Sequence, residues 1–231
     1  QKIEQQIEAG IYPGASFAYY QNGSWSDWYF GNSNPETGEK TREGLIYDLA
    51  SVTKVVGVGT VLTFLWQEGK LDIDEPISTY LPQATYPDIS IRQLLTHVTD
   101  LDPFIPNRDQ LTSDQLKEAM FHLQRREKRT FLYSDVHFLL LGFMLEVYFK
   151  KNLDQIFQEE VFDPWEMRDT KFGPVSDAVP TVRGQKAGVV HDPKARLLGK
   201  HAGSAGLFST IKDLKIFLEH YLQDDFADGL S

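Results

Sequence analysis

The chain has 231 residues, enough for one large domain or two closely packed lobes, and its 41% hydrophobic and 24% charged residues are typical of a soluble globular protein. Its 33 acidic and 23 basic residues give a net charge of -10, and no basic stripe interleaved with aromatic residues is present, so nucleic acid is excluded as a partner. Because cysteine is absent, disulfides, thiolate metal sites and a cysteine nucleophile are excluded as well.

The first part of the chain is rich in strand and turn signals. Residues 1–10 are polar and amphipathic, so they predict neither a signal peptide nor a membrane span, and the compartment stays open. Strands and turns are expected from about residue 12 to 50. Asn22-Gly23 between two aromatic-rich runs predicts a β-hairpin formed by residues 14–20 and 24–30.

The most informative motif is Ser51-Val52-Thr53-Lys54, at the start of the apolar run 55–66. A serine and a lysine three positions apart share one face of a helix, so the lysine amine can reach the serine hydroxyl. Apolar residues surround the axis of the expected helix, which predicts that it is buried. A serine hydroxyl needs a partner to take its proton, and burial disfavours the charged form of a lysine, so this pair is typical of a nucleophile and its base.

The same spacing occurs again at Ser209-Thr210-Ile211-Lys212, where a structural interpretation is sufficient. Ser209 or Thr210 is expected to cap a helix, Asp213 to complete a capping box with Thr210, and Lys212 to face water. The second motif therefore predicts a helix start and no chemistry.

The middle of the chain, from Ser51 to about Phe162, has a helical pattern. The basic cluster at residues 125–129 is interpreted as a solvated helix end. Tyr133-Ser134-Asp135 opens a helix expected from residue 136 to about 150. Ser134 or Asp135 can cap that helix. Alternatively, Tyr133 and Asp135 aim a phenol and a carboxylate into a cleft, where Lys54 is a candidate cation beside the phenol.

The histidines show no spacing typical of metal ligands, so structural roles are expected for them and no metal is predicted. They are His97, His122, His137, His191, His201 and His220.

The last part of the chain, from residue 163 to 209, is rich in loops, and a final helix is expected from about 210 to 222. A strand-rich start followed by a helical insert is typical of a sheet that later strands complete, because a two-stranded hairpin is marginal by itself. Further strands are therefore expected beyond residue 231.

Together these motifs resemble the serine β-lactamase and penicillin-binding protein superfamily, in particular its class C-like branch. Ser51 and Lys54 match the family's Ser-x-x-Lys motif, and Tyr133-Ser134-Asp135 is similar to its Tyr-x-Asn motif with Asp135 in place of the asparagine. Other segments similar to the family are Pro13-Gly14-Ala15 and residues 49–54, 68–72, 80–82, 94–97, 190–193 and 205–210. The family's third motif, Lys-Thr-Gly or His-Thr-Gly, is expected beyond Ser231, because His201-Ala202-Gly203 precedes a segment that comes before that motif in the family.

The resemblance implies an α+β fold of the β-lactamase type, with an antiparallel sheet and flanking helices plus an all-helical lobe. The whole chain, residues 1–231, is expected to form one such domain, truncated at its C-terminus. Residues 1–70 and 163–231 are expected in an α/β lobe that lacks its C-terminal strands. Residues 71–162 are expected in the helical lobe.

The resemblance also implies acyl transfer. Ser51 attacks a carbonyl, Lys54 or Tyr133 or both accept its proton, Tyr133 protonates the leaving group, and Asp135 binds substrate. β-Lactams, D-Ala-D-Ala peptides and esters are the implied substrates, small molecules or peptidoglycan-derived, with no metal or organic cofactor. A low-turnover or non-catalytic module that binds peptidoglycan remains the alternative. The resemblance also implies a bacterial protein of the cytoplasm or the cell envelope. It implies nothing about the oligomeric state.

Overall fold

The computed structural model describes residues 2–182 and 184–222, which pack into two compact units. The first unit takes in the described residues of Gln1–Asp48, Trp165–Val189 and Phe208–Ser231. The second takes in Leu49–Pro164 and Val190–Leu207. All the site residues predicted from the sequence belong to the second unit.

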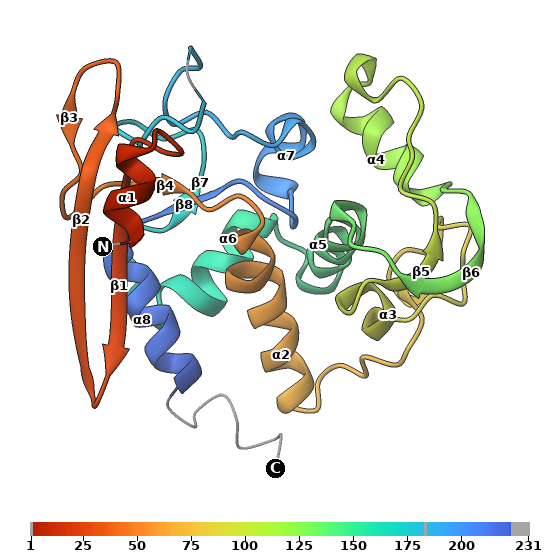
Figure 1. Cartoon of the computed structure of the whole chain (residues 1–231). Helices are drawn as coiled ribbons and strands as arrows, with labels where there is room; N and C mark the ends of the chain where they lie inside the picture. The colour runs from red at the N-terminus through yellow and green to blue at the C-terminus, as the bar shows by residue number, and fades with distance from the viewer. Residues whose placement is uncertain (1, 183, 223–231) are drawn as a thin grey trace. The chain divides into compact units, whose positions relative to one another are not determined.

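The first unit is built on a long antiparallel hairpin, β1 (Gly14–Gln21) and β2 (Ser24–Asn34), extended by β3 (Glu39–Lys40) (Figure 1). Gln21 pairs with Ser24 across a two-residue turn. Asn22 and Gly23 both have left-handed φ, at 52° and 80°, which is the geometry of a type I′ turn. The predicted hairpin is therefore confirmed.

A second small sheet and two helices complete the first unit. The sheet has the strand order β4 (Tyr47–Asp48), β8 (Leu207–Ser209), β7 (Lys171–Phe172), and the helices are α1 (Lys2–Glu8) and α8 (Ile211–Leu222). Helix α8 is bound to the hairpin by the ion pair of Lys215 Nζ with Asp27 Oδ2, at 2.6 Å. The predicted final helix is confirmed.

The start of α8 differs in one detail from the prediction. Thr210 Oγ1 accepts a hydrogen bond from Asp213 N at 3.3 Å, and Lys212 is exposed, as expected. The Asp213 carboxylate, however, accepts from Asp169 N at 2.8 Å and from Thr170 Oγ1 at 2.7 Å instead of returning to the cap. The predicted capping box is wrong because a neighbouring loop supplies better donors for this buried carboxylate.

The second unit is mainly helical. A π-helical turn, η1 (Lys54–Gly59), runs directly into α2 (Thr60–Gln67), and α5 (Asp135–Phe149) forms the centre of the core. Every residue of α5 from Val136 to Leu145 is buried, as expected of a helix that is apolar on all sides. The other helices and turns of this unit are η2 (Ile77–Thr79), α3 (Ile91–Leu95), η3 (Arg108–Gln110), α4 (Ser113–Phe121), α6 (Leu153–Phe157), η4 (Gln158–Phe162), α7 (Pro193–Leu198) and η5 (Gly199–His201).

The helix that follows Ser51 is less buried than expected. Val56, Val58, Val61 and Leu62 are at most 1% exposed, but Val55 is 50% exposed. The apolar residues thus occupy a buried face and an exposed one, so apolar composition alone overestimated the burial of this helix.

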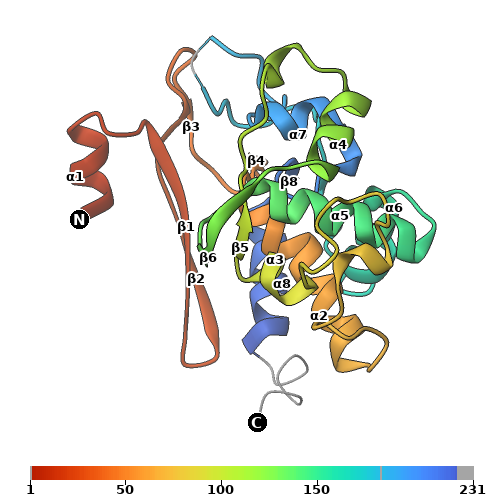
Figure 2. The same ribbon diagram turned by 90° about the vertical axis from the view of Figure 1, so that its right-hand side faces the viewer.

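The basic cluster at residues 125–129 lies in a strand and not at a helix end. β6 (Arg125–Phe131) pairs antiparallel with β5 (Val98–Leu101) (Figure 2). Arg126 donates to the carbonyl oxygen of Thr99 at 2.6 Å, and Arg125 forms ion pairs with Asp88 and Asp100 at 2.7 Å each. The strand forms because partners distant in sequence satisfy these guanidinium groups, and residues 125–129 alone carry no strand periodicity.

Gly57 permits the close packing of η1 against the helix α6. A Cβ at this position would lie 2.4 Å from Cε2 and 2.5 Å from Cζ of Phe157, a fully buried ring. We expect Gly57→Ala to lower the free energy of unfolding by about 1–3 kcal/mol, because the ring has no room to move. Urea titration measures this change. Gly59→Ala is the matched control, since the atom nearest to its Cβ would be Lys54 O, at the longer distance of 3.1 Å. A loss for Gly59→Ala as large as that for Gly57→Ala would contradict the argument.

The fold is α+β, with antiparallel sheets and flanking helices, as predicted. Residues 49–70 pack within the second unit, and the division into lobes at residues 70 and 163 stays a prediction. Among the helices of the described residues, none is long and apolar enough to cross a membrane.

Candidate functional site

Ser51 and Lys54 lie within hydrogen-bonding distance, as their spacing predicts. Ser51 is exposed just before η1, and Lys54, the first residue of η1, is only 3% exposed. The Lys54 Nζ to Ser51 Oγ distance is 2.9 Å. The buried lysine therefore presents its amine to a hydroxyl that a ligand can reach.

Two further acceptors hold the Lys54 amine in place. Nζ donates to Asp135 Oδ1 at 2.7 Å and to the carbonyl oxygen of Ser204 at 2.9 Å. A lysine nitrogen has four tetrahedral positions, of which one is its bond to Cε. With two of the other three directed at Asp135 and Ser204, the third faces Ser51.

The contact with Ser204 depends on two glycines, Gly142 and Gly203, for which the sequence predicted no packing role. A Cβ on Gly203 would lie 2.2 Å from the carbonyl oxygen of Phe138, and Gly203 Cα lies close to Gly142 in α5. Without side chains at these two positions, the backbone before Ser204 can lie directly on α5 and reach Lys54. The run of small residues from Ala202 to Gly206 is the sequence signal of this close approach.

Asp135, the first residue of α5, lies between two lysines. Its Oδ1 contacts Lys54, and its Oδ2 contacts Lys194 Nζ at 3.0 Å. Burial raises the pKa of the Asp135 carboxyl, but hydrogen bonds and charges from Lys54 and Lys194 outweigh it and hold the pKa below its usual value. Asp135 is therefore ionised at neutral pH, and each of its oxygens has a cationic partner.

Lys194 was not predicted as a site residue. It lies in the first turn of α7, where Asp192 caps the helix by accepting from Ala195 N at 2.8 Å and Pro193 takes the first position. Asp-Pro is a helix-start signal that the sequence displays. What the sequence does not display is that this helix start lies beside Asp135.

Tyr133 contacts Lys54 through its aromatic ring. The Lys54 nitrogen is 5.0 Å from the centroid of the Tyr133 ring, a cation–π contact with the ring. The Tyr133 ring also packs on His97, with 4.6 Å between centroids, and its side chain is half exposed. The structure thus brings together all four residues predicted for the site: Ser51, Lys54, Tyr133 and Asp135.

A buried pair of histidines supports the segment that carries Tyr133. His97 Nδ1 lies 2.9 Å from His137 Nδ1 and accepts from Ser134 N at 3.3 Å. Because His97 Nδ1 is an acceptor, His137 Nδ1 carries the proton between the rings, and His137 Nε2 accepts from Thr99 Oγ1 at 2.9 Å. The pair is therefore a structural hydrogen-bond chain of two neutral rings, in agreement with the structural role predicted for the histidines.

The neutral histidine pair predicts that the protein loses stability in mild acid. Burial, with the charges of His97 and Arg126, lowers the pKa of His137 to about 3. Burial and, after it, the charge of Lys54 lower the pKa of His97, and the charge of Asp135 opposes this shift. The unfolded chain takes up these protons near pH 6.5, whereas the folded chain does not. The free energy of unfolding should therefore fall as pH decreases from 7 to 4.5, by up to about 1.4 kcal/mol per pH unit through His137, and the lowered pKa of His97 acts in the same direction.

Urea unfolding at several pH values measures this slope. His137→Asn should make the slope smaller, because the variant lacks the buried imidazole whose pKa is lowered. An equal slope in wild type and His137→Asn would contradict the assignment.

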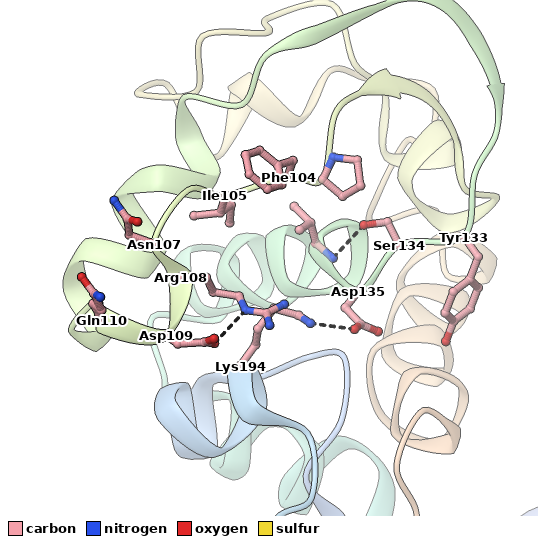
Figure 3. A pocket seen from close by; sticks show the side chains of 12 residues that line it. Phe104, Ile105, Asn107, Arg108, Asp109, Gln110, Tyr133, Ser134, Asp135 and Lys194 are labelled. Atoms are coloured by element: carbon pink, nitrogen blue, oxygen red, sulfur yellow. Dashed lines mark hydrogen bonds and ion pairs between the residues drawn. The ribbon is translucent and has the colours of Figure 1, made fainter.

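Asp135 and Lys194 face a cavity of about 630 Å³. Figure 3 shows the Lys194 side chain directed at Asp135 and Arg108 beside Asp109 on the facing loop. The lining is made of the loop before and within η3, the start of α5, and one residue of α7: Pro103, Phe104, Ile105, Asn107, Arg108, Asp109, Gln110, Tyr133, Ser134, Asp135, Val136 and Lys194. A ligand in this cavity would touch Tyr133 and Asp135, two of the four predicted site residues, whereas Ser51 and Lys54 are not among the lining residues.

Within residues 2–182 and 184–222, no group of three or more His, Asp or Glu side chains is placed to hold a metal ion. His201, which the sequence reasoning rejected as part of the third motif, lies 2.6 Å from Glu146 through its Nδ1. The third motif itself is expected beyond residue 231, outside the described residues.

This arrangement of a helix-borne Ser-x-x-Lys pair beside a Tyr-x-Asp segment, on an α+β framework, defines a protein of the serine β-lactamase type. A family model described as Beta-lactamase matches residues 1–230. The chain belongs to that family, and the resemblance to the serine β-lactamase and penicillin-binding protein superfamily is confirmed.

Similar proteins include one of Escherichia coli (strain K12) named "Putative D-alanyl-D-alanine carboxypeptidase", which is 29% identical over 272 residues, covering 95% of this chain and 62% of that protein. The chain thus spans less than two thirds of the length of this curated relative. Two solved structures share the fold. The D-amino acid amidase from Ochrobactrum anthropi SV3 superposes with a TM-score of 0.77 at 20% identity, over 99% of this chain and 72% of that one. The class C β-lactamase from Rhodobacter sphaeroides superposes with a TM-score of 0.73 at 21% identity, over 95% and 64%.

Proposed function

We propose that this protein is a serine hydrolase that forms an acyl-enzyme on Ser51. The observation that carries the proposal is the environment of the Lys54 nitrogen, which is held by Asp135 and Ser204 so that its remaining position faces Ser51 Oγ at 2.9 Å. In its neutral form, Lys54 can donate two hydrogen bonds to the fixed acceptors and receive the serine proton on its lone pair, and it then becomes the cation that pairs with Asp135. Family membership supports the same chemistry.

In the first half of the reaction, Ser51 Oγ bonds to the substrate carbonyl carbon while its proton passes to Lys54 Nζ. The bond from that carbon to the leaving nitrogen or oxygen then breaks. Tyr133, whose ring lies over Lys54, gives its hydroxyl proton to the leaving group and is reprotonated from Lys54. In the second half, water attacks the acyl-enzyme, its proton passes to the same groups, and Ser51 Oγ leaves with a proton.

The proposed substrates carry a carbonyl in a β-lactam, a D-Ala-D-Ala peptide or an ester. The names of the similar proteins, a putative D-alanyl-D-alanine carboxypeptidase, a D-amino acid amidase and a class C β-lactamase, support small molecules or peptidoglycan-derived peptides of this kind. Asp135 and the cavity that it lines are the proposed substrate-binding region.

Intact-mass spectrometry after exposure to a penicillin and to p-nitrophenyl hexanoate tests this proposal, with Ser51→Ala as the control. A Ser51-dependent adduct that lasts indicates a slowly deacylating penicillin-binding enzyme, and Ser51-dependent loss of the reagent without an adduct indicates rapid turnover of that reagent. If neither reagent reacts in a Ser51-dependent way, the proposal is wrong. The remaining alternative is then a non-catalytic, ligand-binding module of the same fold.

A further inference from the structure

Resting on the proposed function, we propose that Lys194 is the cation that binds substrate in this site, and that it takes a carboxylate on the substrate. Asp135 then acts as a positioning residue, which holds Lys194 over the cavity and Lys54 over Ser51. The proposal stands on the contacts of these two lysines with one carboxylate and on the cavity that Lys194 lines.

Asp135 is poorly suited to bind substrate by itself. An ionised carboxylate only accepts hydrogen bonds, whereas the oxygens of a substrate acyl group need donors. Both oxygens of Asp135 already have an ammonium group at 3.0 Å or less, so a third cation on the substrate gains little from it. The residue that stands in the position of the family's asparagine thus has no donor of its own to offer.

Lys194 can supply the missing donor. Its side chain is 13% exposed, and its nitrogen contacts Asp135 at 3.0 Å and Asp192 at the longer distance of 3.7 Å. An ammonium carries three N–H groups, so these two carboxylates leave one for a ligand in the cavity that Lys194 lines. A partly desolvated ammonium held in one orientation binds an anion more strongly than a mobile surface lysine does.

Two cations with N–H groups to spare line the cavity. Besides Lys194, these include Arg108 in η3, which has five N–H donors and contacts Asp109 through Nε at 3.3 Å. Arg108 and Lys194 also line an adjoining cavity of about 600 Å³, together with Arg196. The acidic residues of both cavities, Asp109 and Asp135, are each already paired with one of these cations or with Lys54.

Two matched pairs of esters test the proposal and locate the carboxylate. The first pair is mono-p-nitrophenyl adipate and p-nitrophenyl hexanoate, which differ by a carboxylate at the end of the acyl chain. The second is 4-carboxyphenyl hexanoate and its methyl ester, which differ by a carboxylate on the leaving group. The measured quantity is the ratio of kcat/KM for the charged ester to that for the neutral ester.

For Lys194→Met we expect this ratio to fall at least tenfold in one of the two pairs, mainly through KM, and Lys194→Arg should retain part of the preference. Arg108→Met should lower the same ratio to a smaller extent. The matched control is Lys200→Met, at an exposed lysine in the same segment that lies 3.6 Å from Asp154, and it should leave both ratios within twofold of wild type.

Unchanged ratios in Lys194→Met, with hydrolysis still dependent on Ser51, would overturn this inference and leave the proposed function intact. If the wild type hydrolyses none of the esters in a Ser51-dependent way, the proposed function fails instead. In that case calorimetric binding of monomethyl adipate, compared with methyl hexanoate, decides the inference by itself. If the wild type binds monomethyl adipate more tightly than methyl hexanoate and Lys194→Met abolishes this preference, the assignment is supported. If Lys194→Met binds monomethyl adipate as the wild type does, the assignment is rejected.

Discussion

Ser51→Ala is expected to lower kcat/KM for ester or β-lactam hydrolysis by at least about a thousandfold, because it removes the atom that bonds to the substrate carbonyl. Ser51 is exposed and precedes the buried part of η1, so the variant should keep the wild-type fold. Steady-state hydrolysis of p-nitrophenyl hexanoate, with circular dichroism to confirm folding, measures the effect.

The chain offers a matched control in its second Ser-x-x-Lys sequence. Ser209 is 1% exposed and shares a hydrogen bond of 2.7 Å with Thr170, so Ser209→Ala should cost about 1 kcal/mol of stability and leave turnover in place. If Ser51→Ala kept wild-type turnover, or if folded Ser209→Ala lost it, Ser51 could not be the nucleophile.

Lys54→Met is expected to lower kcat by about 10²–10⁴-fold, since it removes the group that receives the serine proton. The same change should also destabilise the protein, because it takes one of two cations away from the partly buried Asp135 carboxylate. Lys212→Met, in the second Ser-x-x-Lys sequence, is the control for both effects, since Lys212 is exposed.

The double variant Lys54→Met with Asp135→Asn separates catalysis from stability. Removing both charges should restore part of the lost free energy of unfolding, because no carboxylate is then left short of a cation, but it should restore no turnover. Recovery of turnover in the double variant would show that Lys54 serves only to neutralise Asp135. Turnover by Lys54→Met at the wild-type rate would exclude Lys54 as the base.

The parts of the molecule that the sequence predicts well depend on residues that are close in the chain. Asn22-Gly23 predicts its hairpin because the two left-handed φ angles of a type I′ turn are a property of those residues. The contact of Ser51 with Lys54 follows from the pitch of a helix, and the start of α5 from the cap at Ser134, whose Oγ accepts from Val136 N at 3.2 Å.

Errors arose where distant partners decide the local structure. Residues 125–129 form a strand because β5, Asp88 and Asp100 are there to pair with it, and Asp213 leaves its own helix cap for Thr170 and the backbone of Asp169. Neither outcome leaves a mark in the local periodicity, which is the signal that the predictions used.

By itself the sequence determined the α+β class, the hairpin, the last helix and the four residues that meet at the site, because each depends on helix or turn geometry or on motifs that the family shares. Only the tertiary structure brought the Ser204 carbonyl to Lys54 and Lys194 to Asp135. Those contacts join segments far apart in the chain. They exist because glycines at 142 and 203 let two backbones touch and because the partly buried Asp135 carboxylate is stabilised by a lysine at each oxygen.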